Sequence, residues 1–232
     1  AFSGGVDSAF LARAAKDGLG GRVLLLTAAS HTYPFFELEE ARTLATQLGM
    51  EHRVIHSEEI DIPGFSDNPP ERCYHCKKVL FALAKKIADS EGVRAVFDGS
   101  NADDVHDYRP GRKALVELGI VSPLCEAGLT KEDIRALSRA YGLPTAGKAS
   151  FACLASRFPY GEKITREKLQ RTAKAEWAVR QMGFSQFRVR NHDNLARLEF
   201  APAELDKAWS MREELDEACR DAGYVFVSLD LR

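Results

Sequence analysis

The sequence lacks the features of a secreted or membrane-spanning protein. No apolar run reaches a length of about 18 residues, the minimum for a helix that crosses a bilayer, and no signal-peptide pattern opens the chain. The cysteine count is odd, at 5, in a chain of 232 residues that is too large to need disulfides for its stability. We therefore expect a cytoplasmic protein with no membrane partner, whose reduced thiols serve metal or redox chemistry.

The sequence also lacks an excess of charge of either sign. Its 32 Lys and Arg residues face 34 Asp and Glu residues, which gives a net charge of −2, so no general basic field recruits nucleic acid. Any site for a polyanion must therefore be local. The chain is 45% hydrophobic and has no internal repeat or low-complexity tract, which is enough for one good core and a smaller second one.

Strand-like and helix-like stretches alternate up to about residue 147. The expected strands are 22–28, 52–56 and 94–98, and the expected helices are 37–48, 76–90 and 131–141. Thr130 is placed to cap the last of these helices, which ends at Gly142. The alternation predicts a parallel sheet with helices on both faces, and in such sheets ligands bind at the carboxyl ends of the strands.

The pattern changes after residue 147. A long helix is expected at 165–182, and the stretches that follow are strands at 187–189 and 195–200, a helix at 202–221 and a strand at 224–229. This order predicts a small α+β domain. We expect two domains, 1–147 with the parallel sheet and 148–232 as the smaller α+β domain that binds the substrate.

The string SGGVDS, residues 3–8, joins a short apolar stretch to the apolar-periodic run of a helix. Adjacent glycines let the backbone come close to a ligand, and the first N–H groups of a helix are unpaired, so the loop is suited to an anion. A carboxylate there makes sense if Mg²⁺ accompanies the anion. The candidate residues are Ser3, Gly4, Gly5, Asp7 and Ser8. Because the chain begins at Ala1, we expect the preceding strand to begin before it.

An ordinary strand-to-helix turn is the alternative, since Ser, Gly and Asp are common turn residues. The loop is not a Walker A motif, which would need GK[ST]. The string resembles the signature of PP-loop ATP pyrophosphatases. This resemblance implies a Rossmann-like α/β domain of the adenine nucleotide α-hydrolase type, with ATP and Mg²⁺ as ligands and cleavage between the α and β phosphates. Weaker candidates for nucleotide or metal contact lie in the segment DGSNADD, namely Asp98, Asn101 and Asp103, for which a cap or turn role is equally open.

Two cysteines lie three positions apart in PPERCYHCKK. Cys73 and Cys76 precede a predicted helix, whose N-terminus and following lysines would lower the pKa of both thiols. The spacing leaves a metal or cluster site, a redox dithiol and two unrelated cysteines open. A zinc site would need further ligands, for which the candidates are His75, Cys125 and Cys153.

Five segments occur in order along essentially the whole chain: SGGVDS, NPPERCYHCKK, FDGSNADDVHDYRPGRKA, CLASRFPYGEKIT and FRVRNHDNLARLE. In order and spacing they resemble the LarE family of ATP-dependent sulfur transferases, which make the nickel-pincer cofactor of lactate racemase. The resemblance implies that carboxylates of pyridinium-3,5-biscarboxylic acid mononucleotide are adenylylated and converted to thiocarboxylates. It also implies a nucleotide-like small-molecule substrate, a homo-oligomer, and handover of the product to the nickel-inserting enzyme of the pathway.

The family supplies sulfur in two ways. In the sacrificial type a lone cysteine, which aligns with Ala152, gives up its sulfur and becomes dehydroalanine. This chain instead has Cys73, Cys76 and Cys153, so the resemblance implies a [4Fe-4S] cluster with one iron open for a labile sulfide, and a catalytic rather than single-turnover protein. Cys125 and Cys219 fall outside the motifs and are expected to be plain buried thiols.

Arg188 and Arg190 lie two positions apart on an expected strand, so they point to the same face and suit a phosphate. A solvated arginine pair is the alternative. By resemblance both bind the substrate phosphate, and Arg157 is expected to neutralise the carboxylate being activated or the departing AMP. The other residues that the resemblance places in this site are Ser156, Glu176 and Asp206.

Three other functions remain as alternatives. A PP-loop tRNA thiolase can also use three cysteines and a cluster, but the acidic balance and the absence of zinc-finger cysteines argue against it. Ammonia-using PP-loop synthetases have no use for the three cysteines. A nucleotide-binding iron-sulfur sensor without turnover is the alternative outside enzymes.

Overall fold

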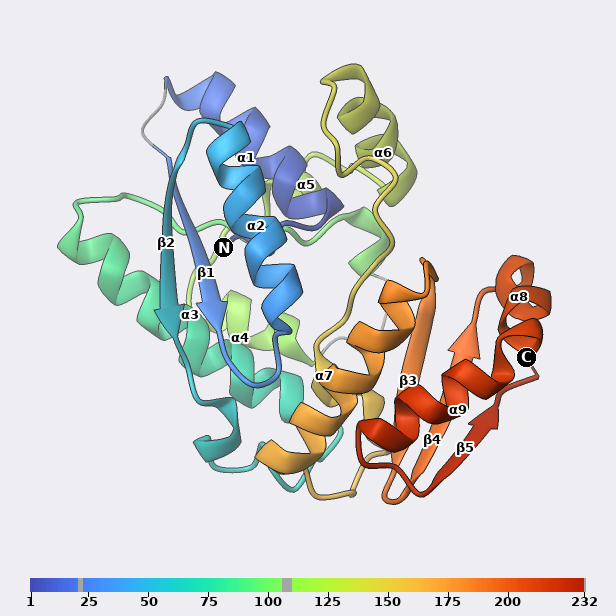
Figure 1. Cartoon of the computed structure of the whole chain (residues 1–232). Coiled ribbons are helices and arrows are strands. Elements are labelled where there is room, and N and C mark those ends of the chain that lie inside the picture. The colour runs from blue at the N-terminus through green and yellow to red at the C-terminus, as the bar shows by residue number, and fades with distance from the viewer. Residues whose placement is uncertain (21–22, 106–109, 232) are drawn as a thin grey trace. The chain divides into compact units, whose positions relative to one another are not determined.

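The computed structural model describes residues 1–20, 23–105 and 110–231. They form two compact units (Figure 1). The first unit comprises Ala1–Phe65 and Pro70–Ser150, and the second comprises Ser66–Pro69 and Phe151–Arg232. The sequence analysis placed the division between residues 147 and 148 and gave the second domain no segment from earlier in the chain. Among the described helices, none is both long enough and apolar enough to cross a membrane.

The first unit is built on parallel strands. β1 (Leu24–Ala29) pairs in parallel with β2 (Glu51–His56), with Leu24 opposite Glu51 and Ala29 opposite His56. The helices of this unit are α1 (Val6–Leu19), α2 (Phe35–Gln47), α3 (Arg72–Ser90), α4 (Gly111–Glu117), α5 (Pro123–Glu126) and α6 (Lys131–Ala140). Two 3₁₀ turns, η1 (Glu59–Asp61) and η2 (Ala102–Val105), complete it.

Two extended segments continue the parallel arrangement beyond the regular strands. The Phe2 N–H donates to the Leu26 carbonyl at 2.8 Å, and Phe97 forms a parallel bridge with Val121. The strand expected at 94–98 is thereby reduced to a single bridge. The carboxyl ends of these segments lead into residues 3–8 and 98–104, which places both motifs at the edge of the sheet where ligands bind.

Helices cover both faces of this sheet. Successive strand residues point to opposite faces, and Leu25 packs in one cluster with α1 and α2 residues. Its neighbour Leu26 packs against a second cluster that includes Phe81 of α3 and Leu115 of α4. Figure 1 shows α2 lying along β1 and β2. The expected parallel α/β fold of the Rossmann-like type is confirmed.

Some boundaries differ from those expected. α3 begins at Arg72 rather than at residue 76, and its N-cap Glu71 makes no side-chain cap hydrogen bond, so no capping residue marked the start in the sequence. α6 begins as expected, with Thr130 and Asp133 forming a capping box. Helices α4 and α5 were not expected. Residue 22 of the strand expected at 22–28, and residues 106–109 of the long motif, lie outside the described residues.

The second unit packs two helices on one face of a three-stranded sheet. β3 (Phe187–His192) and β4 (Leu195–Phe200) are antiparallel, and β5 (Phe226–Leu229) pairs in parallel with β4. Its other elements are the 3₁₀ turns η3 (Leu154–Arg157) and η4 (Pro202–Glu204), and the helices α7 (Arg166–Gln181), α8 (Leu205–Ser210) and α9 (Arg212–Asp221). The helix expected at 202–221 is therefore broken.

The core of the second unit fixes which side chains of β3 face away from it. Val189 of β3 and Leu198 of β4 are buried in one cluster with Val179 of α7 and Leu215 of α9. Each such side chain contributes about 1.5–3 kcal/mol when removed from water. Because side chains alternate along a strand, the charged residues next to Val189 lie on the opposite face.

A short segment from earlier in the sequence belongs to the second unit. The Asn68 side chain donates to the Pro159 carbonyl at 2.6 Å, and the Asn68 carbonyl accepts from the Gly161 N–H at 2.9 Å. The Ser66 carbonyl accepts from Ile164 N–H at 2.8 Å. These bonds hold 66–69 against the FPYG turn.

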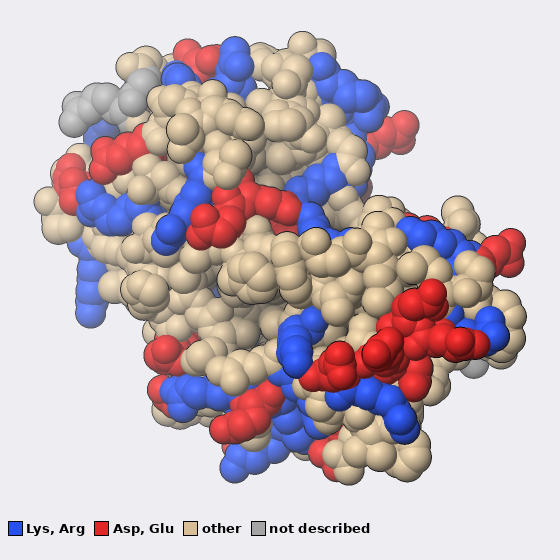
Figure 2. Space-filling model, viewed as in Figure 1, with Lys and Arg blue, Asp and Glu red and all other residues tan. Residues whose placement is uncertain are grey.

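Charged side chains are mixed over the face that Figure 2 shows, where Lys and Arg are interspersed with Asp and Glu. Acidic side chains gather over α9, whose exposed acidic residues are Glu213, Glu214, Glu217 and Asp221.

Candidate functional site

The loop at residues 3–8 presents a row of unpaired backbone donors. α1 begins at Val6, and its N-cap Gly5 makes no side-chain cap hydrogen bond. Among the described residues, no acceptor pairs with the backbone N–H groups of residues 4–8. Unpaired N–H groups at the start of a 14-residue helix carry the positive end of its dipole. The loop therefore presents the kind of backbone donors that an anion would accept from.

Gly4 is required by the shape of this loop. Its φ of +65° lies in the left-handed region, and a Cβ added there would stand 2.9 Å from the Cα of Ala41 in α2. Both the backbone conformation and the close approach of α2 exclude a larger residue. The loop is thus held against α2.

The two serines of the loop tie its ends together. The Ser3 N–H donates to the Ser8 Oγ at 3.2 Å, the two hydroxyls lie 3.2 Å apart, and the Ser8 hydroxyl donates to the Gly5 carbonyl at 3.2 Å. Ser8 is buried. In this arrangement the hydroxyls shape the loop from within.

Asp7 lies beside the segment 98–104, as expected from the fold. Its Oδ1 accepts from the Asn101 Nδ2 at 3.4 Å, and a Cβ on Gly99 would lie 3.6 Å from the Asp7 Cβ. The other carboxylate oxygen of Asp7 forms an ion pair with the Lys131 ammonium. The Lys131 ammonium thus shows that a positive charge can be placed on the Asp7 carboxylate. A carboxylate is also the kind of ligand that Mg²⁺ binds.

The two aspartates of that segment have structural partners. Asp98 is 4% exposed, and its oxygens accept from the Ser100 hydroxyl at 2.6 Å and the Ser122 hydroxyl at 2.5 Å. Asp103 accepts from the Lys131 N–H at 2.8 Å at the start of α6. Both carboxylates serve turn and cap roles in this structure, while Asn101 contacts the loop.

Two residues outside the motifs contact the loop from the side away from its N–H groups. The Tyr33 hydroxyl donates to the Ser3 carbonyl at 2.7 Å, and the Lys148 ammonium lies 3.3 Å from the Gly4 carbonyl. Neither residue carried a signal in the sequence analysis, and Lys131 carried none either. Each belongs to a polar stretch without a motif of its own.

Cys73 and Cys76 lie in the first turns of α3. Residues three positions apart share one face of a helix, so the two thiols lie on the same side, close to the positive end of the helix dipole. Cys73 is exposed and Cys76 is half-buried. Among the described residues, no group of three or more His, Cys, Asp or Glu side chains is placed to hold a metal ion.

The remaining cysteines differ in exposure. Cys153 is exposed and is the N-cap of η3 in the second unit. Burial, together with Asp216, raises the pKa of the Cys219 thiol to about 12, so this cysteine stays a protonated core residue. Cys125 is half-buried in α5.

A buried ion pair lies at the centre of the second unit. Arg157 is 1% exposed and Glu176 is 0% exposed, and the guanidinium donates to the two carboxylate oxygens at 2.5 and 3.2 Å. The Glu176 Oε1 also accepts from the Val189 N–H at 3.0 Å, and Arg157 donates to the Ser156 hydroxyl at 2.9 Å. The pair joins η3, α7 and β3.

Arg188 and Arg190 both lie on the face of β3 away from the core. The Arg190 guanidinium donates to the Glu199 carboxylate at 2.9 Å and to the Ser156 carbonyl at 2.8 Å. Arg188 has no hydrogen bond or ion pair among the described residues, and burial, followed by the charges of Arg157 and Arg190, lowers its pKa. An unpaired cation next to two others is a position for an anion. Asp206 is exposed in the first turn of α8 and pairs with none of these arginines within the described part of the chain.

Comparison with known proteins places the chain in a family. The family model for asparagine synthase matches residues 1–198. Pyridinium-3,5-bisthiocarboxylic acid mononucleotide synthase of Lactiplantibacillus plantarum is 34% identical over 232 residues, which are 100% of this chain and 84% of that protein. The chain belongs to the LarE family of PP-loop proteins.

Two uncharacterised relatives also match the chain over its whole length. An uncharacterised protein of Synechocystis is 41% identical over 233 residues, covering 100% of this chain and 87% of the relative. An uncharacterised protein of Methanocaldococcus jannaschii is 29% identical over 240 residues, with coverages of 100% and 88%. The LarE resemblance inferred from the five motifs is confirmed.

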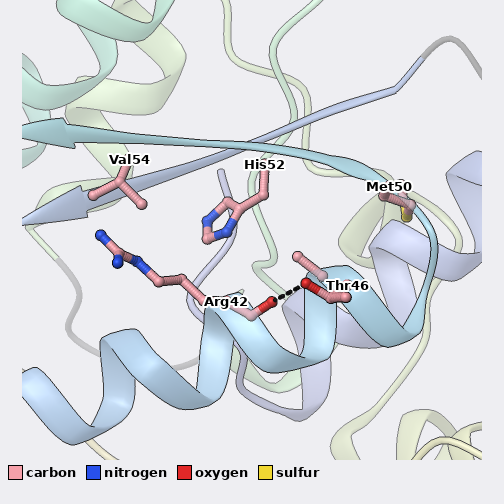
Figure 3. A pocket seen from close by; sticks show the side chains of 6 residues that line it. Arg42, Thr46, Met50, His52 and Val54 are labelled. Carbon is pink, nitrogen blue, oxygen red and sulfur yellow. Dashed lines mark hydrogen bonds between the residues drawn. The ribbon is translucent and has the colours of Figure 1, made fainter.

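A surface hollow of this LarE-family chain lies away from the loop at residues 3–8. Figure 3 shows it between α2 and the amino end of β2, with Arg42 and His52 pointing into it. Burial and the charge of Arg42 lower the pKa of His52, whose ring also lies 2.8 Å from the Thr27 hydroxyl. Ligands of parallel sheets bind at the carboxyl ends of strands, whereas this hollow lies at the amino end of β2.

Proposed function

We propose that this protein uses ATP to adenylylate carboxylates of a pyridinium-3,5-dicarboxylate mononucleotide and then replaces the activated oxygen with sulfur, as a bond forms from sulfur to the carboxyl carbon and the bond from that carbon to AMP breaks. The observation that carries the proposal is the likeness to the Lactiplantibacillus plantarum synthase, which extends over 100% of the chain at 34% identity. The name of that protein gives its product as a bisthiocarboxylic acid mononucleotide. The substrate class is therefore a nucleotide-like dicarboxylate.

In the activation step, the loop holds the pyrophosphate part of ATP through the unpaired N–H groups of residues 4–8. A substrate carboxylate oxygen forms a bond to the α-phosphorus while the bond from that phosphorus to the bridging oxygen breaks and pyrophosphate leaves. The carboxylate is already ionised at neutral pH, so no strong base is needed. Asp7 would hold Mg²⁺, which supplies positive charge at the departing pyrophosphate, and Lys131 would move from Asp7 to the phosphates.

Arg188 is the candidate for the substrate phosphate, supported by its lack of an internal partner and by its lowered pKa. Arg190 lies on the same face of β3, and its guanidinium donates to the Ser156 carbonyl. Arg190 and Ser156 are therefore further candidates for this site. The guanidinium of Arg157 is committed to Glu176. We therefore assign Arg157 and Glu176 the role of positioning η3, and keep Asp206 as a further candidate for this site.

The sulfur source is assigned to Cys73, Cys76 and Cys153. The support is that two thiols share a face of α3 near its N-terminus and that Cys153 is exposed next to Ser156 and Arg157. Three thiolates suit a [4Fe-4S] cluster, which would supply a labile sulfide when bound. A cytoplasmic homo-oligomer that hands its product to a nickel-inserting enzyme completes the proposal.

An activity assay under anaerobic conditions tests the proposal. Protein, ATP and Mg²⁺ are incubated with the pyridinium dicarboxylate mononucleotide, with tRNA, or with neither, and AMP and pyrophosphate are measured. We expect release only with the mononucleotide. Release stimulated by tRNA instead would overturn the proposal in favour of tRNA thiolation.

Two variants separate the activation step from the sulfur step. Asp7→Asn should lose pyrophosphate release, and AMP release with it, but keep about four irons per chain, the content of one [4Fe-4S] cluster. Cys153→Ala should lose the iron and keep one round of pyrophosphate release, with AMP retained in the acyl-adenylate because no sulfur displaces it. Protein without iron whose mass falls by one sulfur on turnover would establish the sacrificial route instead.

A further inference from the structure

The carbonyl groups of the loop are held by side chains from two other segments. The Tyr33 hydroxyl donates to the Ser3 carbonyl at 2.7 Å and the Lys148 ammonium donates to the Gly4 carbonyl at 3.3 Å. Building on the proposed function of the loop, we propose that Tyr33 and Lys148 are positioning residues that aim its N–H groups at the pyrophosphate. Neither residue touches the reacting atoms.

The geometry of the peptide bond carries this inference. In a trans peptide the C=O of one residue and the N–H of the next point in opposite directions, and no cis peptide occurs in the described chain. A donor that holds the Ser3 carbonyl therefore turns the Gly4 N–H the other way, and a donor on the Gly4 carbonyl does the same for the Gly5 N–H. Glycine at both positions leaves these peptides free to rotate unless something holds them.

Lys148 is fully occupied in this role. An ammonium has three protons, and three acceptors surround this one: the Gly4 carbonyl at 3.3 Å, the Glu37 carboxylate at 2.7 Å and the Glu40 carboxylate at 2.8 Å. The Lys148 side chain is 16% exposed and the Glu37 side chain 4% exposed. Two carboxylates outweigh its single charge, so Lys148 adds orientation and little net positive potential to the loop.

The position of Lys148 is itself fixed. Arg135 of α6 donates to the Ala146 carbonyl at 2.6 Å and to the Lys148 carbonyl at 2.9 Å, which anchors the backbone beneath the side chain. On the other side of the loop, Ala41 of α2 blocks any shift of Gly4. Gly4 is therefore held between the Ala41 side of α2, which it cannot approach further, and the Lys148 ammonium, which binds its carbonyl.

Tyr33 stays a donor at all working pH values. Burial, together with the charges of Glu37 and Glu40, raises the pKa of its phenol. Its hydroxyl also lies 3.2 Å from the Glu37 carbonyl, so both positioning residues are tied to the first turn of α2.

The test measures binding of pyrophosphate with Mg²⁺ by isothermal titration calorimetry. Lys148→Met alone would leave the buried Glu37 without its ammonium partner, so Glu37→Gln/Lys148→Met is compared with Glu37→Gln. Tyr33→Phe is compared with the unmodified protein. Loss of one positioning hydrogen bond should raise the dissociation constant for pyrophosphate about fivefold in each comparison. The stoichiometry should stay at one pyrophosphate per chain. Lys148→Arg should restore much of the affinity because it keeps a cationic donor.

The readout separates positioning from stability. A structural effect that inactivates part of the protein irreversibly lowers the stoichiometry at an unchanged dissociation constant, and one that unfolds it reversibly appears in the melting temperature of the variant without ligand; a change in binding fully explained by either would overturn the inference. Equal affinity of Glu37→Gln/Lys148→Met and Glu37→Gln, with the unmodified protein binding normally, would also overturn it. Absence of binding by the unmodified protein would instead overturn the proposed function of the loop, and this inference with it.

Discussion

The loop of the first unit and the arginine face of the second unit are both suited to phosphate, but they differ in what binds it. The loop uses backbone N–H groups and contains no cationic side chain. The arginine face, formed by Arg188 and Arg190 of β3, uses side-chain charge, and Arg190 is held in place by the half-buried Glu199. The buried pair of Arg157 and Glu176 supports β3 through the Val189 N–H. A backbone site depends on conformation, whereas a side-chain site depends on charge balance.

The difference determines how each site fails. Removing Lys148 or Tyr33 releases one carbonyl of the loop and so reorients one donor, while a change in the backbone shape at Gly4 displaces several donors together. Removing one charge from the arginine face leaves its partner uncompensated in a poorly solvated place. The two sites should therefore respond to different substitutions and to salt in different degrees.

The largest effect is expected from breaking the buried pair. Arg157→Met should lower the free energy of unfolding by about 3–5 kcal/mol, because it leaves the Glu176 carboxylate buried without its cation. Arg157→Met/Glu176→Met should recover at least about 1 kcal/mol of that loss. Urea denaturation measures both. A double variant less stable than Arg157→Met would contradict this account of the pair.

Next in size is the effect of distorting the loop. Gly4→Ala adds a Cβ 2.9 Å from Ala41 to a backbone with a φ of +65°, and it should weaken pyrophosphate binding about a hundredfold, as expected for a shift on the scale of 1 Å. Gly142→Ala is the matched control, because its φ is +67° and a Cβ there meets nothing within 4 Å. It should lose about 1 kcal/mol of stability and bind pyrophosphate normally. Equal binding losses in both variants would assign the effect to backbone strain alone.

A smaller effect should follow from removing one charge of the arginine face. Arg188→Gln should raise the KM for the mononucleotide about tenfold, because it removes a charged hydrogen bond to the phosphate, and leave the KM for ATP unchanged. The KM for the mononucleotide should also depend less on salt than before. Arg197→Gln is the control, since Arg197 lies on the same strand pair but is engaged by Glu199 and Asp230. Similar KM values in the two variants would remove Arg188 from the site.

The smallest effect is expected at the hollow of Figure 3. Arg42→Gln should leave pyrophosphate binding unchanged, which would separate this hollow from the loop at residues 3–8. It should raise the pKa of His52 toward its ordinary value, since the charge of Arg42 contributes to lowering it. NMR titration of the imidazole measures the shift. A pyrophosphate affinity that falls in this variant would move the anion site to the hollow.

The features predicted from sequence are those encoded in short stretches. The loop at residues 3–8 is contiguous, and the alternation of Arg188 and Arg190 on β3 follows from the period of a strand. The cap of α6 was visible because Thr130 and Asp133 are three positions apart. In each case one local rule was sufficient.

The features missed depend on contacts between distant residues. Lys131 meets Asp7 across 124 positions, and Lys148 meets Gly4 across 144, so no window of the sequence contains both partners. The helix expected at 202–221 is interrupted at Met211, whose φ of −104° and ψ of 23° depart from helical values, and neither Pro nor Gly marks this break. Packing, rather than local preference, decides such positions.

The start of α6 has a consequence for redesign of the chain. Three side chains accept hydrogen bonds from backbone N–H groups at the start of this helix: Thr130, Asp133 and Asp103. These bonds fix the backbone at Lys131. Residues 130–133 consequently form one structural unit, in which the capping box of Thr130 and Asp133 sets the position of Lys131. Inserting a single amino acid between Thr130 and Lys131 would turn the lysine about 100° around the helix axis, while grafting residues 130–133 as a unit would carry the lysine that pairs with Asp7 with them.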